Sequence, residues 1–337
     1  MELIRRIRSV LPGGAAGTAG IRSRVVLRSL WGAVAVLWAL GGIRIFLFHI
    51  STDPFNDLHV YYDAAARLNA GLPLYPPGAR IYPPLFSILF RPLALLPFEL
   101  AAVIWEAILL AALGLTLWRI GIRRPATWWA VLLLSIGIGW TLAIGQVEAI
   151  VALLLTIGSP FTVALAGNIK LYPLAAGIYW LARRDWQALG RLAGWTAALV
   201  LLQLILDPAD TLAFPGTLAP SQVASEVSSS GNLSPFVISP VVWLVCVAIE
   251  VAVAWRFGRT RWGWAAAVGL AVLAPPRVFS YNLMTLLACL GGPDMVRADG
   301  DAGRASSPAR LRLGVRRRDR DRDVCSPRTS QPTHHPR

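Results

Sequence analysis

The sequence predicts an all-α polytopic membrane protein, and two observations support that prediction. Its 337 residues are 55% hydrophobic and only 15% charged, and their mean hydropathy is +0.56. The apolar residues also gather into runs of roughly 18 to 22, the length needed to cross the hydrocarbon core as a helix. Because lipid offers the backbone no hydrogen-bond partners, repeated helical crossings are the expected solution. We expect a bundle of about eight to ten transmembrane helices and no soluble domain of useful size.

The net charge of +14 raises the question of a nucleic-acid partner. Lys170 is the only lysine, and the other basic residues are arginines that gather at segment ends and in the tail. That distribution is typical of cytoplasmic loops that orient a membrane protein, so we expect no nucleic acid. The three cysteines lack the spacing of zinc or redox sites, and we expect no metal, disulfide or cofactor.

The chain divides into three predicted parts. Residues 1–28 form a basic cytoplasmic lead-in, residues 29–291 a transmembrane domain, and residues 292–337 a disordered, arginine-rich cytoplasmic tail with no apolar periodicity. The first span, about 29–50, is longer than a signal-peptide core and has no cleavage site after it. It therefore runs outward and places the following stretch on the outer face.

That stretch, "DPFNDLHVYYDAAARLNAG" at 53–71, has the spacing of a helix with two polar faces. Asp53–Pro54 or Asn56 supplies the expected N-terminal cap. One face carries Asp57 and Tyr61, and the other carries His59 and Asp63. An interfacial helix anchored by its tyrosines is the alternative without chemistry.

The next segments are predicted in order. Residues 84–96, broken by prolines, form a half-helix or interfacial helix, and 98–119 form a full span that ends inside at arginines. Residues 127–144 cross outward, and a segment from about 147 goes inward. Residues 161–182 form two half-helices broken around Lys170–Pro173, or a single crossing.

The C-terminal half of the domain has a simpler pattern. Residues 186–206 cross outward, 207–235 form a polar outer loop rich in Pro, Ser and Gly, and 236–256 cross inward. The pair 262–276 and 278–291 forms a last hairpin, with "APPRVFSYN" at its outer turn.

Several motifs occur together in a specific order. "NDLHVYYDAAARLNAGLPLY" is followed by "YPPLFSILFRPLALLP", Trp105, "GQVEAIVALLL" and "IKLYPL" with "YWLARRDW". Over about residues 29 to 290 the chain resembles the polyprenol-phosphate-mannose-dependent mannosyltransferases of glycosyltransferase family 87. The resemblance implies a GT-C fold, an active site on the outer face under the first loop, and a lipid-phosphate sugar donor.

The resemblance also implies that Asp57 is the catalytic aspartate. Transfer from a polyprenyl-phosphate sugar has a good leaving group, but the acceptor hydroxyl needs a base, and one carboxylate can supply it. Direct displacement then inverts a β-linked donor into an α-linked product.

The donor phosphate needs cations or hydrogen-bond donors on the outer side. Arg277 is the best placed, followed by Arg80 and Lys170. A solvated loop charge is the alternative for Arg80, and an ammonium that snorkels to the interface is the alternative for Lys170. Gln146 either caps a turn or touches a sugar hydroxyl. We also expect Tyr61, Tyr82 and Tyr281 to bind substrate.

The sequence departs from the family pattern in three places. Some relatives carry a histidine pair near the last outer turn, where this chain has Ser280, Tyr281 and Asn282. The linker "LLLTIGSPFTVALAG" is short and lacks charge, and the later spans stop early at the arginine-rich tail. Glu106, Glu148 and Glu250 lie in apolar runs, and we do not expect them to be catalytic, although such carboxylates are functional candidates.

The predicted function is transfer of a hexose, with mannose as the expected sugar, from a polyprenyl phosphate to a lipid or glycan acceptor. The partners are therefore the donor, the acceptor and membrane lipid, in a multi-pass protein of a bacterial plasma membrane with its active site outside. The alternative is a transporter or flippase-like protein, which would show inverted repeats and charges near the midplane.

Overall fold

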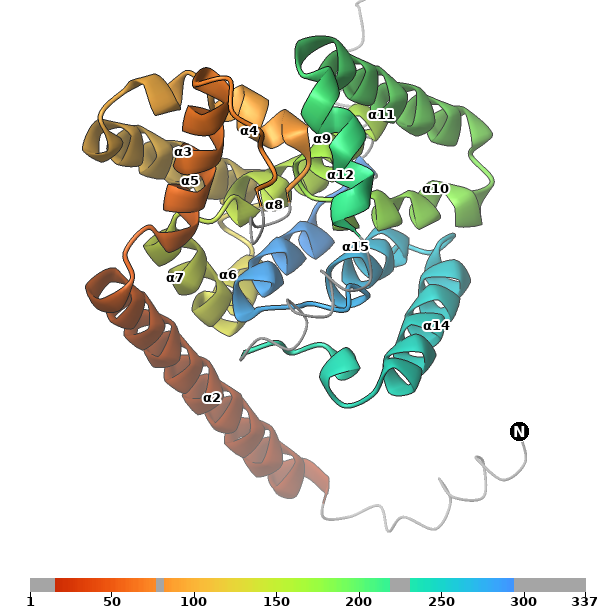
Figure 1. Ribbon diagram of the computed structural model, residues 1–337. Helices are drawn as coiled ribbons and strands as arrows, with labels where there is room; N and C mark the ends of the chain where they lie inside the picture. The colour runs from red at the N-terminus through yellow and green to blue at the C-terminus, as the bar shows by residue number, and fades with distance from the viewer. Residues whose placement is uncertain (1–15, 77–81, 219–230, 294–337) are drawn as a thin grey trace, which may run out of the picture. The chain divides into compact units, whose positions relative to one another are not determined.

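The computed structural model describes residues 16–76, 82–218 and 231–293. Every regular element within these ranges is a helix (Figure 1). The prediction of an all-α membrane protein is therefore confirmed. Arg80 and the predicted tail from residue 294 onward lie outside the described residues.

Four helices are long and apolar enough to cross a membrane by themselves. They are the Ser29–Thr52 part of α2 (Ala16–Thr52), α5 (Phe98–Ile120), α11 (Trp186–Leu206) and α14 (Pro240–Phe257). Only 11% of the apolar stretch of α11 and 6% of that of α14 are buried inside the protein. Apolar side chains that the protein does not cover are the ones expected to face lipid.

The predicted span at 127–144 is bent rather than straight. It consists of α6 (Pro125–Leu133) and α7 (Ser135–Ile144), which meet at 63°. The α7 backbone lies against α2, where a Cβ on Gly139 would come within 2.5 Å of the Gly42 carbonyl oxygen. Small residues permit such close backbone contact between membrane helices. Counted as one crossing, this pair raises the number of spans among the described residues to five.

Shorter apolar helices fill the centre of the bundle. They are α8 (Glu148–Ile157), α9 (Pro160–Ile169), α15 (Gly263–Leu273) and the 3₁₀ helix η4 (Ser280–Leu290). A ten-residue α-helix rises only about 15 Å, so the segment predicted to go inward from residue 147 is too short to be a full crossing by itself. The predicted eight to ten segments are reached only when these partial crossings are counted. The last hairpin, by contrast, is confirmed as α15 and η4.

The break predicted around Lys170–Pro173 is confirmed. Helix α9 ends at Ile169, Lys170 has extended backbone, and the chain continues as η2 (Tyr172–Gly177) and α10 (Ile178–Arg183). Pro173 has no N–H for an α-helical hydrogen bond, and this favours the interruption. Whether the two pieces together make a single crossing of the membrane stays a prediction.

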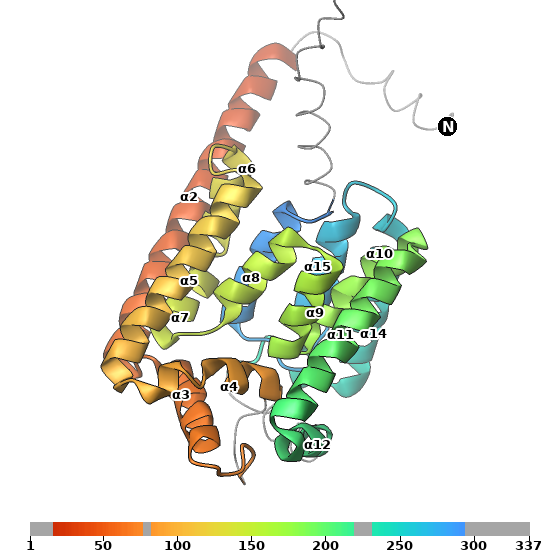
Figure 2. The same cartoon turned by 90° about the horizontal axis from the view of Figure 1, so that it is seen from above.

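Short elements gather at the end of the bundle where α2 finishes (Figure 2). They are α3 (Asn56–Asn69), α4 (Pro84–Phe90), η1 (Leu93–Leu95), α12 (Pro208–Thr217) and η3 (Pro235–Val237). The predicted 207–235 loop thus contains a helix, because the Asp207 side chain accepts from the Asp210 N–H and caps α12. The Leu74 N–H donates to Asp210 (3.0 Å), and the Leu85 N–H donates to Gln203 (3.0 Å). We call this the α3 end of the bundle.

The helix ends that carry arginines lie at the opposite end of the bundle. Helix α5 begins near α3, where the Tyr62 hydroxyl donates to the Leu96 carbonyl (2.6 Å), and it finishes beside Arg119. Helix α11 starts just after Arg184 and ends at Leu206, close to the α3 end. Arg183 donates to the carbonyl of Gly258 (2.9 Å), which joins the ends of α10 and α14. Basic termini and α3 are therefore separated along the helix axes (Figure 2).

Candidate active site

Helix α3 starts without the predicted side-chain cap. Its N-cap residue is Phe55, in a left-handed conformation with φ 56°, and no side chain caps the helix. The Asp53 carboxylate instead accepts from the Thr52 hydroxyl and pairs with His49 Nδ1, each at 2.8 Å. The Phe55 N–H donates to the carbonyl of Ala143 (3.1 Å), so a contact with α7 fixes the turn. The predicted caps at Asp53 and Asn56 are therefore wrong.

The two predicted faces of α3 are confirmed. Asp57 and Tyr61, one turn apart, are 3% and 2% exposed. His59 and Asp63 lie on the exposed side, and the His59 ring stacks on Phe98 with centroids 3.8 Å apart. Asp57 also lies in the first turn, where the positive end of the helix dipole stabilises a carboxylate.

Gln146 joins Asp57 to Tyr61. Its side-chain N–H donates to Asp57 Oδ2, and its oxygen accepts from the Tyr61 hydroxyl and from the Val147 N–H. Burial, and then the neighbouring Tyr82 and Asp57, raises the pKa of Tyr61 well above its ordinary value, so the phenol remains a donor. Gln146 itself is fully buried, and its amide orients the Asp57 carboxylate.

The turn that carries Gln146 requires a glycine. Gly145 ends α7 with φ 70°, and a Cβ there would come within 2.8 Å of Leu58 Cβ. The Trp105 indole N–H donates to the Gly145 carbonyl (2.8 Å), and the Gln146 N–H donates to the Thr141 carbonyl (2.8 Å). These contacts hold the turn against α3, and Gln146 therefore lies beside Asp57.

Two neighbouring pockets open at the α3 end. The first contains Asp57 and is also lined by His49, Asp53, Asn56, Trp140, Ile144, Arg277, Phe279 and Tyr281. The second contains Lys170 and is also lined by Tyr82, Pro83, Leu171, Tyr172, Phe214, Leu218, Arg277, Phe279, Tyr281 and Asn282. We call them the aspartate pocket and the lysine pocket. Arg277, Phe279 and Tyr281 line both, so one short segment forms a shared wall.

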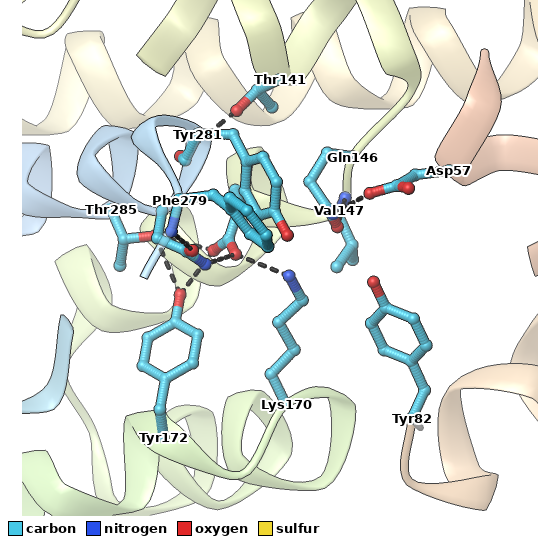
Figure 3. A network of polar contacts seen from close by, with 12 residues as sticks. Asp57, Tyr82, Thr141, Gln146, Val147, Lys170, Tyr172, Phe279, Tyr281 and Thr285 are labelled. Atoms are coloured by element: carbon cyan, nitrogen blue, oxygen red, sulfur yellow. Dashed lines mark hydrogen bonds and ion pairs between the residues drawn. The ribbon is translucent and has the colours of Figure 1, made fainter. Parts of the chain in front are cut away.

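The lysine pocket combines a cation with aromatic rings (Figure 3). The Lys170 ammonium lies 5.5 Å from the Tyr82 ring centroid and 5.3 Å from that of Tyr281. The Arg277 guanidinium lies 4.7 Å from the Phe279 ring centroid. The negative face of such a ring attracts a cation.

A fully buried carboxylate lies behind Lys170. Glu148, the first residue of α8, accepts from the Lys170 ammonium (2.6 Å) and from the Asn282 amide (2.6 Å). Its other oxygen accepts from the hydroxyls of Tyr172 and Thr285, the latter at 2.9 Å. This Glu148 cluster joins α8, the Lys170 break and η4.

The structure brings together all of the predicted site residues that it describes. Asp57, Gln146 and Tyr61 form one hydrogen-bonded group, and Lys170, Tyr82, Arg277 and Tyr281 line the lysine pocket. Glu148 was not predicted as a site residue, yet its fully buried carboxylate accepts from Lys170 at 2.6 Å. The sequence did contain an indication, because a lysine within an apolar run, such as Lys170, needs a carboxylate partner.

Comparison with known proteins gives a family and two relatives. The model of glycosyltransferase family 87 matches residues 81–291. A "Polyprenol-phosphate-mannose-dependent alpha-(1-2)-phosphatidylinositol pentamannoside mannosyltransferase" of Mycolicibacterium smegmatis is 34% identical over an alignment of 160 residues, and the match covers 40% of this chain and 39% of that relative. A protein of the same description from Mycobacterium tuberculosis is 34% identical over 93 residues, 24% of this chain and 22% of the relative.

These alignments span less than half the length of either relative. No solved structure matches the chain at a significant level. The family match includes Gln146, Glu148, Lys170 and Arg277 and starts after Asp57. Because it covers well over half of the sequence, the chain belongs to glycosyltransferase family 87.

Proposed function

We propose that this protein transfers mannose from a polyprenyl phosphate to a hydroxyl group of a glycolipid acceptor, with inversion at the sugar. The observation that supports this proposal best is the pair of adjoining pockets, one with a buried carboxylate and the other with two cations. Both relatives are described as using polyprenol-phosphate-mannose and a phosphatidylinositol mannoside. Sugar transfer from a lipid phosphate needs a base on one side of the sugar and an anion site on the other.

Asp57 is the proposed general base. It lines the aspartate pocket, and Gln146 holds one of its oxygens in place. An acceptor hydroxyl in that pocket would give its proton to Asp57 while its oxygen attacks the anomeric carbon. The bond to the phosphate breaks on the opposite side, so a β-linked mannose becomes α-linked.

The lysine pocket is the proposed site of the donor phosphate. Lys170 and Arg277 supply positive charge there, and Tyr82 and Tyr281 line the same pocket. The negative charge that develops on the leaving phosphate would then be stabilised by groups already in position. The apolar side chains of Leu171, Phe214 and Leu218 give the polyprenyl chain a surface of matching character. Arg80 remains a proposed contributor from its position in the sequence.

The α3 end is proposed to face outward from the cell membrane. Arg119, Arg183 and Arg256 lie near the ends of α5, α10 and α14, away from α3. Positively charged termini remain on the cytoplasmic side, so the pockets would open on the outer side. A cavity at one membrane face fits a transferase better than the alternative transporter, which would need a pathway through the bilayer centre.

The test is a transfer assay with purified protein in nanodiscs. Polyprenol phosphate mannose with a labelled sugar is supplied together with mannolipids extracted from a mycobacterium. We expect label to move into the lipid fraction and to be released by an α-mannosidase. Empty nanodiscs are the control for chemical hydrolysis of the donor. Label that stays on the donor with every acceptor lipid would contradict the proposal.

A further inference from the structure

The buried carboxylate of Glu148 is saturated with hydrogen bonds. Lys170 and Asn282 donate to one oxygen, each at 2.6 Å, and Tyr172 and Thr285 donate to the other. These four partners come from two separate stretches of the chain, 170–172 and 282–285. An ionised carboxylate only accepts, and four lone-pair sites match four donors. Glu148 therefore serves its neighbours as a fixed negative charge, and it is not available as a base.

Lys170 depends on that charge. Burial is the largest single influence and lowers the pKa of Lys170, but the Glu148 carboxylate, with smaller contributions from Tyr82 and Asp57, acts against it, and together they raise that pKa above its ordinary value. The other titratable or charged groups that face the ammonium are the phenols of Tyr82, Tyr172 and Tyr281, the Asp57 carboxylate and the Arg277 guanidinium.

We propose that Glu148 is a positioning residue for phosphate recognition: it keeps the Lys170 ammonium protonated and directed into the lysine pocket, where the ammonium binds a polyprenyl phosphate. This inference rests on the proposed function. It assigns recognition of the lipid phosphate to the Lys170 ammonium, with Glu148 as its counter-ion. Glu148 acts only through Lys170 and does not touch the substrate. It also explains why a buried carboxylate occupies the start of α8, where the helix dipole adds to its stabilisation.

The sequence supplies a direct probe, because Lys170 is the only lysine. Reductive methylation with ¹³C-formaldehyde labels Lys170 and the N-terminal amine and leaves both charges in place. The ¹³C shift of the dimethylated Lys170 then reports its protonation. The N-terminal amine titrates near pH 8 and serves as an internal reference. In the wild-type protein we expect the Lys170 signal to stay unchanged from pH 6 to about 10, since its folded-state pKa is raised above the ordinary value of about 10.4.

Replacing Glu148 with glutamine removes the negative charge at nearly constant size. Without its counter-ion the buried ammonium loses its proton more easily, and we expect the Lys170 midpoint to fall by about two pH units or more. Glu250→Gln on α14 is the matched control, because its carboxylate lies in an apolar helix away from both pockets. That variant is expected to keep the wild-type midpoint and the wild-type binding.

Binding is measured with polyprenyl phosphate itself in nanodiscs. In the wild-type protein, this lipid should shift the Lys170 signal. In Glu148→Gln the affinity should fall at least about tenfold at pH 9 and recover as the pH is lowered and Lys170 regains its proton. Adding Lys170→Arg to Glu148→Gln should remove the pH dependence, because arginine stays charged. Affinity that differs from wild type by the same factor at every pH would overturn the proposal.

Two further outcomes separate positioning from simple support of the fold. Thr285→Val removes one donor to Glu148 but keeps the charge, so it should lower the thermal midpoint while the Lys170 titration remains like that of wild type. If Glu148→Gln does not fold, the titration of Lys170 in the wild-type protein still tests the proposal. A Lys170 midpoint below pH 9 would overturn it. If no mannose is transferred but polyprenyl phosphate still shifts the Lys170 signal, the proposed function is refuted and this inference is not. Normal transfer with an unresponsive Lys170 would refute this inference alone.

Discussion

Replacing Gln146 with leucine tests whether the amide of Gln146 orients the catalytic carboxylate. The wild-type side chain is fully buried and makes three hydrogen bonds, with Asp57, Tyr61 and the Val147 N–H. Leucine has a similar volume and no polar atoms, so all three partners lose a bond. The hydrogen bond to the charged Asp57 is worth about 1.5–3 kcal/mol, and each neutral bond about 1 kcal/mol. The free energy of unfolding should therefore fall by about 3 to 5 kcal/mol.

The effect on catalysis should be separable from that loss. If the hydrogen bond between Gln146 and Asp57 no longer stabilises the transition state, a loss of about 1.5–3 kcal/mol corresponds to a decrease in kcat of roughly tenfold to hundredfold. The assay is mannose transfer in nanodiscs, with kcat expressed per folded protein and thermal midpoints measured in parallel. We expect the KM for the donor to change little, since the lysine pocket is not altered.

Gln203→Leu is the matched control for this variant. Gln203 is also buried, at 2% exposed, and it also makes three hydrogen bonds: it accepts from the Leu85 N–H and donates to Asn168 and to the Leu199 carbonyl. It lies away from Asp57, so its loss should lower the thermal midpoint and leave kcat per folded protein nearly unchanged. An equal decrease in kcat for both variants, or wild-type kcat for Gln146→Leu, would show that the Gln146 amide does not orient Asp57 for catalysis.

Three other perturbations follow from the geometry. Gly145→Ala should lower stability by about 1–3 kcal/mol, because alanine is strained at φ 70° and its Cβ would meet Leu58; differential scanning fluorimetry checks this. Gly42→Leu should prevent α2 from packing on α7, since even a Cβ there would come within 2.6 Å of the Ser135 backbone; size-exclusion chromatography should show aggregated protein rather than a single peak. In a cysteine-free background, a cysteine at Asp63 should react with an impermeant maleimide in intact cells, whereas a cysteine at Arg124 should not; the reverse pattern would contradict the outward orientation.

Sequence patterns predicted the fold where a single physical rule dominates. The long helices α5, α11 and α14 follow directly from apolar runs, and the break at Lys170 follows from a charge in an apolar run with a proline three residues later. The paired faces of α3 follow from helical spacing. In each case the signal is local, so no tertiary contact is needed to read it.

The sequence could not predict features that depend on contacts between distant segments. The bend between α6 and α7 and the left-handed Phe55 depend on packing against α2 and α7. Helix α12 is a different case, because its cap at Asp207 is local but the Pro, Ser and Gly residues that follow within 207–235 favoured the prediction of a loop. The Glu148 cluster is the clearest case, since residues 148, 170, 172, 282 and 285 meet only in the folded chain.

The proposed mechanism depends above all on Asp57, and replacing this residue with asparagine tests it most directly. Asparagine keeps the shape of the side chain but cannot accept the acceptor's proton, so mannose transfer should decrease by about 10²-fold to 10⁴-fold. The measurement is the initial rate with labelled polyprenol phosphate mannose in nanodiscs, normalised to folded protein, and Asp63→Asn on the exposed side of α3 is the control. We predict wild-type transfer for Asp63→Asn and near-background transfer for Asp57→Asn. Transfer by Asp57→Asn at the wild-type rate would contradict the account.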